Sequence, residues 1–401
     1  MLRANEVVAA VRRLDLTDFR NYRSLRLDVE PAPVVLTGAN GAGKTNLLEA
    51  LSFLAPGRGL RQAALGDVGR AIDGDAAASW AVVARIDAPN GQITLGSGVE
   101  SSTADVQRNR RIVHIDGAPV RGQAALAEHL SIVWLTPEMD RLFQGGSSGR
   151  RRFIDRMVFG FDPEHVKRLS AYEQALRGRQ RLLHDSVEDA AWLSVIEETI
   201  ASYGVAVAAA RRETAAKLDA ALKSSDATAS LPFPRAGLEL IGEVDTWLAE
   251  EPALAAEDRL RAALAASRRR DGSAGRTEHG PHRSELRVSH IDKNRPASRC
   301  STGEQKALLI AIVLAHARLL TLDRGAAPVL LLDEVAAHLD DERRAALADR
   351  IFDLGAQAWL TGTDESLFES FRGAAQFLRV ADATVSQAAD DREHNLVPKG
   401  D

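Results

Sequence analysis

The segment Gly38–Thr45 reads GANGAGKT and fits the phosphate-binding pattern G-x-x-x-x-G-K-[ST]. It follows the apolar run Val34–Leu36 and precedes a helical pattern at Asn46–Leu54, the strand–loop–helix context that the pattern needs. Glycines let a backbone wrap around an anion, and a helix N-terminus adds partial positive charge. We therefore expect an α/β domain that binds ATP, with Lys44 at the β- and γ-phosphates and Thr45 at Mg²⁺. The expected nucleotide contacts in the loop are Gly38, Ala39, Asn40, Gly41, Ala42, Gly43, Lys44 and Thr45.

A second motif, VLLLDE at Val329–Glu334, is an apolar run that ends in two acids. A buried parallel strand would place Asp333 at its carboxyl end, where α/β proteins bind ligands. We expect Asp333 to lie near Mg²⁺ and Glu334 to polarise the attacking water, which makes Lys44, Asp333 and Glu334 the catalytic set of an ATPase. Alone, the run also fits a core strand. Lys44 and Asp333 are 289 positions apart (333 − 44), so a large insertion must separate two halves of one site.

The segment Ser301–Lys306 reads STGEQK and spells a capping box, with Ser301 as the N-cap and Glu304 three residues later. A helix cap alone would explain it. Its place before the acidic strand, however, resembles the Ser-x-Gly-x-Gln signature of ABC ATPases, and Ala337–Asp340 resembles their D-loop. This resemblance implies that ATP bound to a second subunit meets the signature in trans. The residues concerned are Ser301, Thr302, Gly303, Glu304 and Gln305 in the signature and His338, Leu339 and Asp340 in the D-loop.

The pattern of residues changes twice along the 401-residue chain. Alternating apolar residues predict strands at 12–18, 24–29, 34–38, 79–87, 92–96, 111–115 and 132–135, with an exposed loop at 96–110. A charged helical pattern follows, with breaks at 224–237 and 271–280. The later elements are a helix at 303–323, a strand at 328–333, a helix at 340–354 and a strand at 358–361. We predict an α/β ABC-type P-loop NTPase domain (1–149 and 271–387), a mostly helical inserted domain (150–270) and a disordered tail (388–401).

Composition limits the cellular setting. The net charge of −5 argues against a wholly basic nucleic-acid binder but leaves room for a local basic surface. A single cysteine, Cys300, suits a reducing cytosol. The most apolar run, Ala307–Leu322, contains His316 and Arg318 and is shorter than the ~20 residues of a membrane span. We see no signal peptide in the first residues. The expected protein is cytoplasmic, with no membrane partner.

From near Leu14 to about Val385 the chain resembles the RecF family of DNA-repair ATPases. Leu16–Tyr22 (LTDFRNY) matches the family's opening stretch, which implies nucleotide contacts for Arg20 and Asn21. The remaining matches are the segment around Glu138, in a Q-loop position, the Arg150–Asp155 segment, Gly280–Arg283 with His282, and Thr361–Asp364, where Thr363 or Asp364 would replace a switch histidine. One departure is Ser284, since the family usually has two acids after the arginine of Gly-Pro-His-Arg.

The resemblance to RecF implies a concrete function. RecF proteins bind ATP and Mg²⁺, pair head to tail as homodimers over two nucleotides, and clamp DNA at single-stranded gaps. They act with RecO and RecR to load RecA, and slow ATP hydrolysis releases the clamp. Candidate DNA contacts are Arg150, Arg151, Arg152, Arg156, Arg177, Arg179, Arg181, Arg268, Arg269 and Arg270, although scattered solvated charges would look the same.

Three other classes of protein share parts of this pattern. An ABC transporter motor would carry Leu-Ser-Gly-Gly-Gln rather than STGEQ and lack the large helical insert. An SMC-like structural ATPase would need an insert of hundreds of residues with heptads, and this one lacks sustained apolar a and d positions. A P-loop kinase would leave the signature and D-loop unexplained. Another DNA-repair ATPase related to SMC proteins remains an alternative.

Overall fold

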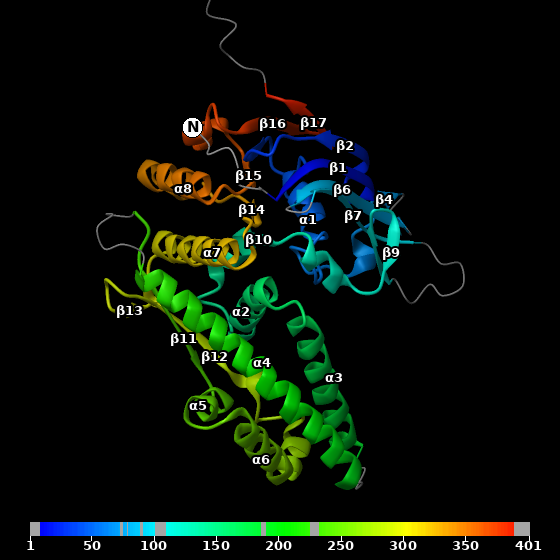
Figure 1. Cartoon of the computed structure of the whole chain (residues 1–401), viewed down its shortest axis with the longest axis vertical. Helices are drawn as coiled ribbons and strands as arrows, with labels where there is room; N and C mark the ends of the chain where they lie inside the picture. Colours follow the sequence, from blue (N-terminus) through cyan, green and yellow to red (C-terminus); the bar gives the residue numbers. More distant parts are fainter. Residues whose placement is uncertain are drawn as a thin grey trace, which may run out of the picture. The chain divides into compact units, whose positions relative to one another are not determined.

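The computed structural model describes residues 9–72, 75–77, 79–88, 91–100, 110–185, 190–224 and 232–388. Contacts between residues divide the chain into two compact units, one formed by 1–136 and 326–401 and the other by 137–325. Figure 1 shows both units and labels elements of each where there is room. Of the predicted tail, only Ala388 lies inside the described residues, and its N–H donates to the Phe377 carbonyl at 3.1 Å.

The first unit contains a six-stranded, mostly parallel sheet. Its first five strands run parallel and the last pairs antiparallel. Strands β3 and β14 are buried along their whole length, which explains their unbroken apolar sequence. The strands predicted at 34–38, 132–135, 328–333 and 358–361 are confirmed. In spatial order the sheet consists of β10 (Ile132–Leu135), β14 (Val329–Leu332), β15 (Ala358–Gly362), β3 (Val34–Thr37), β16 (Gln376–Ala381) and β17 (Thr384–Gln387).

A second six-stranded sheet of the same unit is antiparallel. The predicted loop at 96–110 is wrong at its start, because residues up to Val99 pair with β8; residues 101–109 lie outside the described part. In spatial order this sheet consists of β2 (Tyr22–Asp28), β1 (Ala10–Phe19), β6 (Trp80–Ala88), β7 (Gly91–Val99), β8 (Arg111–Ile115) and β9 (Ala118–Val120). A two-stranded ribbon, β4 (Ala71–Ile72) and β5 (Asp75–Ala76), completes the strands of this unit.

Helix α1 (Lys44–Ser52) contacts both sheets of the first unit, through β14 and β15 on one side and β6 on the other. The rings of Phe19, Phe53 and Trp80 pack against one another, with centroids 4.9 to 5.9 Å apart. This aromatic core fixes the residues after α1 to the antiparallel sheet. The second helix of the unit, α8 (Asp341–Leu354), packs near the 3₁₀ segment Glu365–Phe371.

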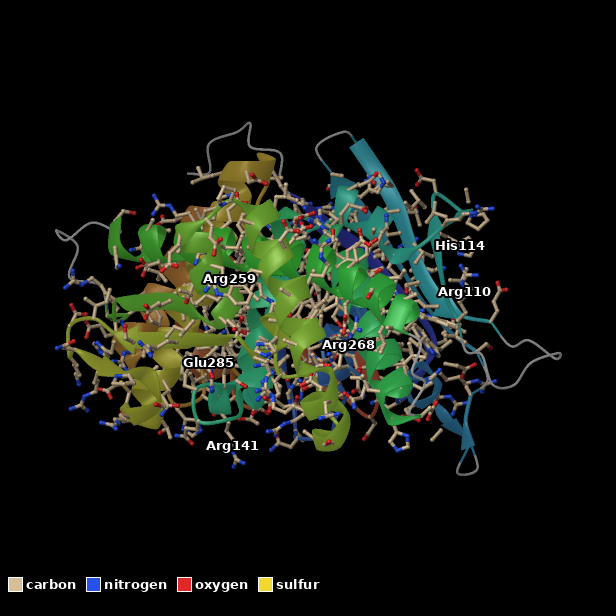
Figure 2. The ribbon with its side chains drawn as sticks, turned by 90° about the horizontal axis from the view of Figure 1, so that it is seen from below. Arg110, His114, Arg141, Arg259, Arg268 and Glu285 are labelled. Carbon is tan, nitrogen blue, oxygen red and sulfur yellow. The ribbon has the colours of Figure 1, made fainter. Side chains whose placement is uncertain are left out.

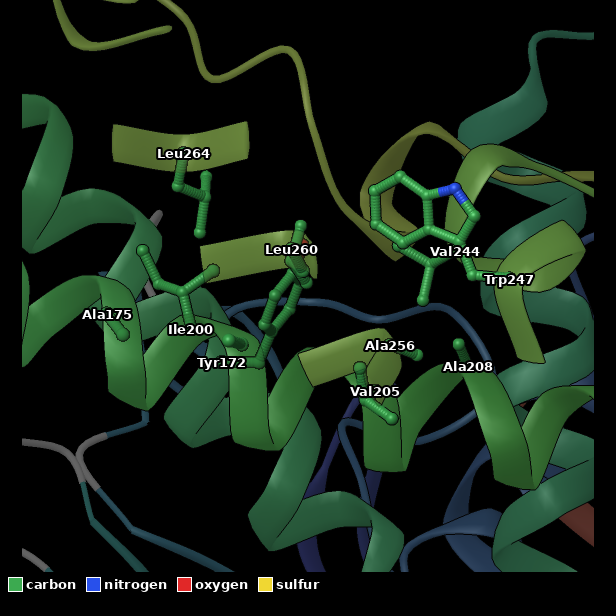
Figure 3. Packing of buried hydrophobic residues seen from close by; sticks show 11 residues of the cluster. Tyr172, Ala175, Ile200, Val205, Ala208, Val244, Trp247, Ala256, Leu260 and Leu264 are labelled. Carbon is green, nitrogen blue, oxygen red and sulfur yellow. The ribbon is translucent and has the colours of Figure 1, made fainter. Parts of the chain in front are cut away.

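The second unit is mostly helical. Its main core joins four helices through Tyr172, Ile200, Trp247 and Leu260, all of which are at most 5% exposed. Figure 3 shows these side chains meeting between the helices. Its helices are α2 (Ser147–Phe161), α3 (His165–His184), α4 (Ala190–Ser224), α5 (Glu243–Glu250), α6 (Ala253–Ala274) and α7 (Thr302–Arg324).

The second unit also contains a three-stranded antiparallel sheet that the sequence analysis did not predict. It is formed by β11 (Ala236–Ile241), β12 (Glu285–His290) and β13 (Arg295–Pro296). Because all six residues of β11 pair with β12, residues 285–290 belong with the helical unit. The division by contacts therefore places 137–149 and 271–325 in this unit, whereas the sequence analysis assigned both segments to the ATPase domain.

Two helices among the described residues, α4 and α7, are long and apolar enough to cross a membrane by length and composition alone. In α7 the most apolar window is 67% buried inside the protein. A core helix of a soluble protein meets the same two criteria, so these helices are weak evidence for a membrane.

Candidate nucleotide site

The loop between β3 and α1 is shaped by three glycines with positive φ. Gly38, Gly41 and Gly43 have φ of 146°, 82° and 115°, backbone conformations that side chains rarely adopt. A Cβ at Gly38 would lie 2.2 Å from the Val380 carbonyl oxygen, and one at Gly43 would lie 2.6 Å from the Asn21 side chain. The loop therefore needs glycine for both conformation and space, and it leads directly into the N-terminus of α1.

Lys44 folds back over this loop. Its Nζ donates to the carbonyls of Gly38 at 2.7 Å and Ala39 at 2.8 Å. Burial lowers the pKa of Lys44, while the nearby charges of Glu334 and Asp333 raise it. The ammonium thus lies at the centre of the loop with only neutral oxygens as hydrogen-bond acceptors, a place where an added anion would be favoured.

Thr45 connects the loop to the second motif. Its Oγ1 shares a hydrogen bond between the two carboxylate oxygens of Asp333, at 2.9 and 3.1 Å. Asp333 directly follows β14 and is 5% exposed. The contact forms because β3, β15 and β14 are adjacent parallel strands whose carboxyl ends meet at one edge. The structure thus brings together the two predicted halves of the site, 288 residues apart.

Glu334 follows Asp333 in a left-handed conformation, with φ of 49°. Its N–H donates to Thr361 Oγ1 at 2.9 Å, and the same hydroxyl donates to Asp333 Oδ1 at 2.7 Å. The sequence analysis named Thr361 only as the first residue of a family match and gave the switch role to Thr363 or Asp364. Thr363 is exposed, and Asp364 accepts from the Ser366 N–H, a bond that lowers the pKa of Asp364.

The two predicted nucleotide contacts from the β1–β2 turn are used differently in this structure. Arg20 pairs with the buried carboxylate of Glu49 on α1 through two hydrogen bonds, at 2.8 and 2.6 Å. Asn21 donates to the Ala42 carbonyl at 3.2 Å and accepts from Asn46 at 2.8 Å. Both residues therefore support the phosphate-binding loop and α1 through these hydrogen bonds. Direct contacts of Arg20 and Asn21 with ATP stay a prediction.

Two further residues that the sequence analysis missed belong to this support. Glu49 is fully buried and also pairs with Arg61 at 2.7 Å. Arg61 donates to the Asn46 side chain at 2.7 Å as well. A glutamate inside an apolar helix stretch was the available signal, because a buried acid needs cationic partners.

No group of three or more His, Cys, Asp or Glu side chains that could hold a metal is found among the described residues. Magnesium usually needs fewer protein ligands, because one or two carboxylates, waters and substrate phosphates complete its shell. The oxygens of Thr45 and Asp333 are ligands of the required kind. Together with the glycine loop and the central Lys44, the site fits a nucleotide phosphate with Mg²⁺.

The signature segment lies in the second unit, at the start of α7. The predicted capping box is confirmed: Ser301 Oγ accepts from the Glu304 N–H at 3.3 Å, and the Glu304 carboxylate accepts from the Ser301 N–H at 2.8 Å. An ion pair with Lys293 and the Ser301 amide lower the pKa of Glu304 to about 2. Ser301 and Thr302 are exposed. Gln305 is buried and donates to the Cys300 carbonyl at 2.8 Å.

The D-loop segment follows Glu334 in the first unit. His338 is exposed and has a positive φ of 65°. Leu339 is buried, and the Asp340 carboxylate caps α8 by accepting from the Arg343 N–H at 2.8 Å. These contacts give Leu339 and Asp340 a structural role, although the Asp340 side chain is exposed, as is that of His338.

Two weaker candidates lie in the second unit. Glu138 is exposed in the 3₁₀ segment Pro137–Arg141. His282 is hydrogen-bonded to Tyr172 Oη at 2.6 Å and the Thr277 carbonyl at 2.9 Å, and burial lowers its pKa. The contacts of His282 suit a structural histidine.

Most of the predicted DNA-contacting arginines are engaged, meaning that they make ion pairs or hydrogen bonds within the protein, and several are exposed. Arg179 is fully buried and pairs with Glu197 and Asp271, and Arg268 (Figure 2) pairs with the same Glu197. The other engaged side chains are Arg150 with Glu285, Arg151 with the Ser284 carbonyl, Arg156 with Met139, Arg177 with Glu173, and Arg270 with Glu278. Arg152, Arg181 and Arg269 are exposed, and so are Arg177 and Arg270, although each of these two makes an ion pair. Arg141, which the sequence analysis missed, extends away from the ribbon in Figure 2.

Residues 10–386 match the family model for the RecF/RecN/SMC N terminal domain. The chain is 50% identical over 380 residues to the DNA replication and repair protein RecF of Mesorhizobium japonicum, covering 95% of this chain and 98% of the relative. The chain belongs to the RecF family. It is also 49% identical over 373 residues to the protein of the same name in Rhizobium etli, covering 93% and 97% of the two chains.

Solved structures show the same fold. The recombination mediator protein RecF-ATPrS in the RecFOR pathway matches with a TM-score of 0.82 at 21% identity, covering 96% of this chain and 100% of that one. A Smc head domain from Pyrococcus furiosus matches with a TM-score of 0.52 at 17% identity, covering 96% and 98%. The predicted fold class, an ABC-type ATPase fold with a helical insertion, is thereby confirmed.

Proposed function

We propose that this protein is an ATP-dependent DNA replication and repair protein that pairs over ATP and holds DNA at single-stranded gaps. The observation that carries the proposal is the meeting of Thr45 and Asp333 beside the glycine loop and Lys44. This contact brings the Lys44 ammonium, which can bind phosphate, close to the Thr45 and Asp333 oxygens, which can bind a divalent metal. Membership of the RecF family is the second support.

In the proposed ATP complex, the amides of the loop from Gly38 to Gly43 surround the phosphates. Lys44 exchanges its contacts with the Gly38 and Ala39 carbonyls for the β- and γ-phosphates. Thr45 and Asp333 would hold Mg²⁺, which neutralises charge that develops on the phosphates. Glu334 orients and polarises the attacking water, so Lys44, Asp333 and Glu334 are the proposed catalytic residues.

The signature is proposed to act in trans. The Ser301 oxygen accepts from its own helix, which leaves the hydroxyl proton for an outside acceptor, and the exposed helix N-terminus favours an anion. A γ-phosphate held by a second copy would meet both. ATP then stabilises the closed homodimer by binding it better than the open state, and slow hydrolysis releases it.

DNA and protein partners follow from the family. Relatives are named DNA replication and repair proteins, and one solved relative is a recombination mediator of the RecFOR pathway. We infer that this chain acts with RecO and RecR to load RecA in the cytoplasm. The exposed Arg152, Arg181 and Arg269 are the side chains best available for DNA phosphates, since the engaged arginines would have to break ion pairs first.

A complementation assay tests the paired site. Lys44→Ala removes the phosphate cation but keeps the signature, and Ser301→Arg blocks the signature but keeps the phosphate loop. Each variant alone should hydrolyse little ATP, while their mixture should regain activity because mixed dimers contain one intact composite site. No regain, although both variants fold and Ser301→Arg still binds ATP, would contradict a site shared between two copies.

A further inference from the structure

Thr361 occupies an unusual position at the carboxyl end of β15. Its side chain is fully buried in the strand between β14 and β3. Its hydroxyl makes two hydrogen bonds to the neighbouring acidic motif, one with the Asp333 carboxylate at 2.7 Å and one with the Glu334 backbone at 2.9 Å. One hydroxyl thus joins two consecutive residues that the proposed function makes catalytic.

The chemistry of the groups determines which one donates in each of the two hydrogen bonds of Thr361. An ionised carboxylate only accepts and a backbone N–H only donates. The Thr361 hydroxyl must therefore give its single proton to Asp333 Oδ1 and accept the Glu334 N–H on a lone pair. A side chain without a hydroxyl would leave a buried N–H and one carboxylate lone pair without these partners.

The two threonines that contact Asp333 differ in how freely their side chains can move. Thr45 lies at the start of α1 and can turn its hydroxyl towards a cation, which is the role proposed for it. Thr361 is fully buried in its sheet, and its hydrogen bond to Asp333 is separate from those made by Thr45. Glu334, moreover, has a φ of 49°, a conformation that a non-glycine residue keeps only when its surroundings hold it.

We propose that Thr361 is a positioning residue that sets the Asp333 carboxylate for the metal and the Glu334 backbone for the water. This inference rests on the proposed ATPase function; the switch role expected of Thr363 or Asp364 is a different one and stays a prediction. Thr363 is exposed two residues further on, after the strand has ended. The role argued for Thr361 is to align two acids from the neighbouring strand, without touching nucleotide itself.

The test compares four full-length proteins: wild type, Thr361→Val, Thr361→Ser and, as a control at an exposed strand threonine, Thr384→Val. Valine keeps the β-branched shape of threonine and suits a strand, so the change removes mainly the hydroxyl. The readouts are the affinity for a fluorescent ATP analogue, measured once with Mg²⁺ and once with EDTA, and the rate of ATP hydrolysis at saturating ATP. Thermal unfolding establishes that each protein is folded at the assay temperature.

The expected result is selective. Thr361→Val should weaken analogue binding about tenfold or more in Mg²⁺, with a similar loss of hydrolysis, because a hydrogen bond to a charged group is lost. In EDTA its affinity should stay within about twofold of wild type, as should both readouts for Thr361→Ser and Thr384→Val. If Thr361→Val does not fold, Thr361→Ala carries the same expectation.

The opposite outcomes are distinct. Equal losses in Mg²⁺ and EDTA, or no loss in either, would overturn the role of Thr361, and so would the same magnesium-dependent loss in Thr384→Val. If wild type itself binds no analogue in Mg²⁺, the proposed function fails first, and the inference fails with it.

Discussion

Ser284 stands where the resemblance to RecF proteins led us to expect an acid, and its surroundings favour serine. It is 1% exposed and its hydroxyl donates to the Asp245 carboxylate. Burial raises the pKa of Asp245, which shows that charge is already costly there. An acid at position 284 would place a second carboxylate against the first, so serine at 284 and aspartate at 245 suit each other.

The predicted effect of Ser284→Asp is a loss of stability that depends on pH. At neutral pH two buried carboxylates would face each other, and the free energy of unfolding should fall by about 3 kcal/mol or more. The raised pKa means that the folded state binds more protons than the unfolded state, so the loss should shrink as pH falls through that pKa. Denaturant unfolding between neutral and acid pH measures this.

Ser284→Ala is the matched control, because it removes the hydroxyl without adding a charge. We expect it to cost about 1–2 kcal/mol. A Ser284→Asp protein whose stability stays parallel to wild type at every pH would show that residues 245 and 284 do not interact as the structure indicates.

At the scale of single residues, the sequence predicted the residues of the candidate nucleotide site better than the residues that support them. Lys44, Thr45 and Asp333 could be placed because each belongs to a motif with a defined strand–loop context. Thr361, Glu49 and Arg61 could not, because their roles depend on which strands become neighbours. The ion pair of Arg20 with Glu49 could not be predicted either, because the two residues lie 29 positions apart; the nucleotide contact expected of Arg20 stays a prediction.

At the scale of elements, α1 is held at its buried face by a charge cluster. Glu49 accepts hydrogen bonds from Arg20 and Arg61, and Arg61 continues to Asn46, which reaches Asn21 behind the loop. These cations compensate the cost of burying a carboxylate that has no exposed surface. The cluster therefore fixes the angle at which the helix N-terminus meets the phosphate loop.

Glu49→Gln should disturb both stability and binding. A glutamine carries no charge and replaces one acceptor oxygen with an NH₂ donor that would face a guanidinium, so we expect the free energy of unfolding to fall by about 2 kcal/mol or more. ATP affinity should fall as well, because the phosphate-binding loop loses the hydrogen bonds that hold it against α1. Denaturant unfolding and nucleotide titration measure the two effects. Exposed Glu128→Gln is the control and should match wild type; equal behaviour of both variants would mean that the cluster is only a surface network.

Elements with long or unbroken patterns were predicted well, among them α7 and β14. Strand β11 was not, because its six residues follow a proline-rich break inside a helical context and pair only with β12, about fifty positions later. Strands β16 and β17 were missed for a similar reason, since β16 gains its place by pairing with β3 from the other end of the chain.

At the scale of the whole molecule, the motif order indicated an interrupted ATPase, and the family match covers residues 10–386. The division between the units was harder to predict. The signature helix α7 was expected with the ATPase strands but clusters with the helices, because its apolar faces pack there. Which arginines remain exposed also required the fold, because burial and ion pairing are not visible in composition.

We predict that ATP controls DNA binding by this molecule. The most direct measurement is fluorescence anisotropy of a labelled duplex with a single-stranded gap, with ATP and Mg²⁺ and without nucleotide. Wild type should bind more tightly with ATP, Glu334→Gln should retain ATP and bind most tightly of all, and Lys44→Ala should not respond to ATP. Added salt should weaken the complex, because phosphate contacts release counterions. DNA affinity that is the same with and without ATP, in a wild-type protein shown to bind ATP, would contradict the central claim.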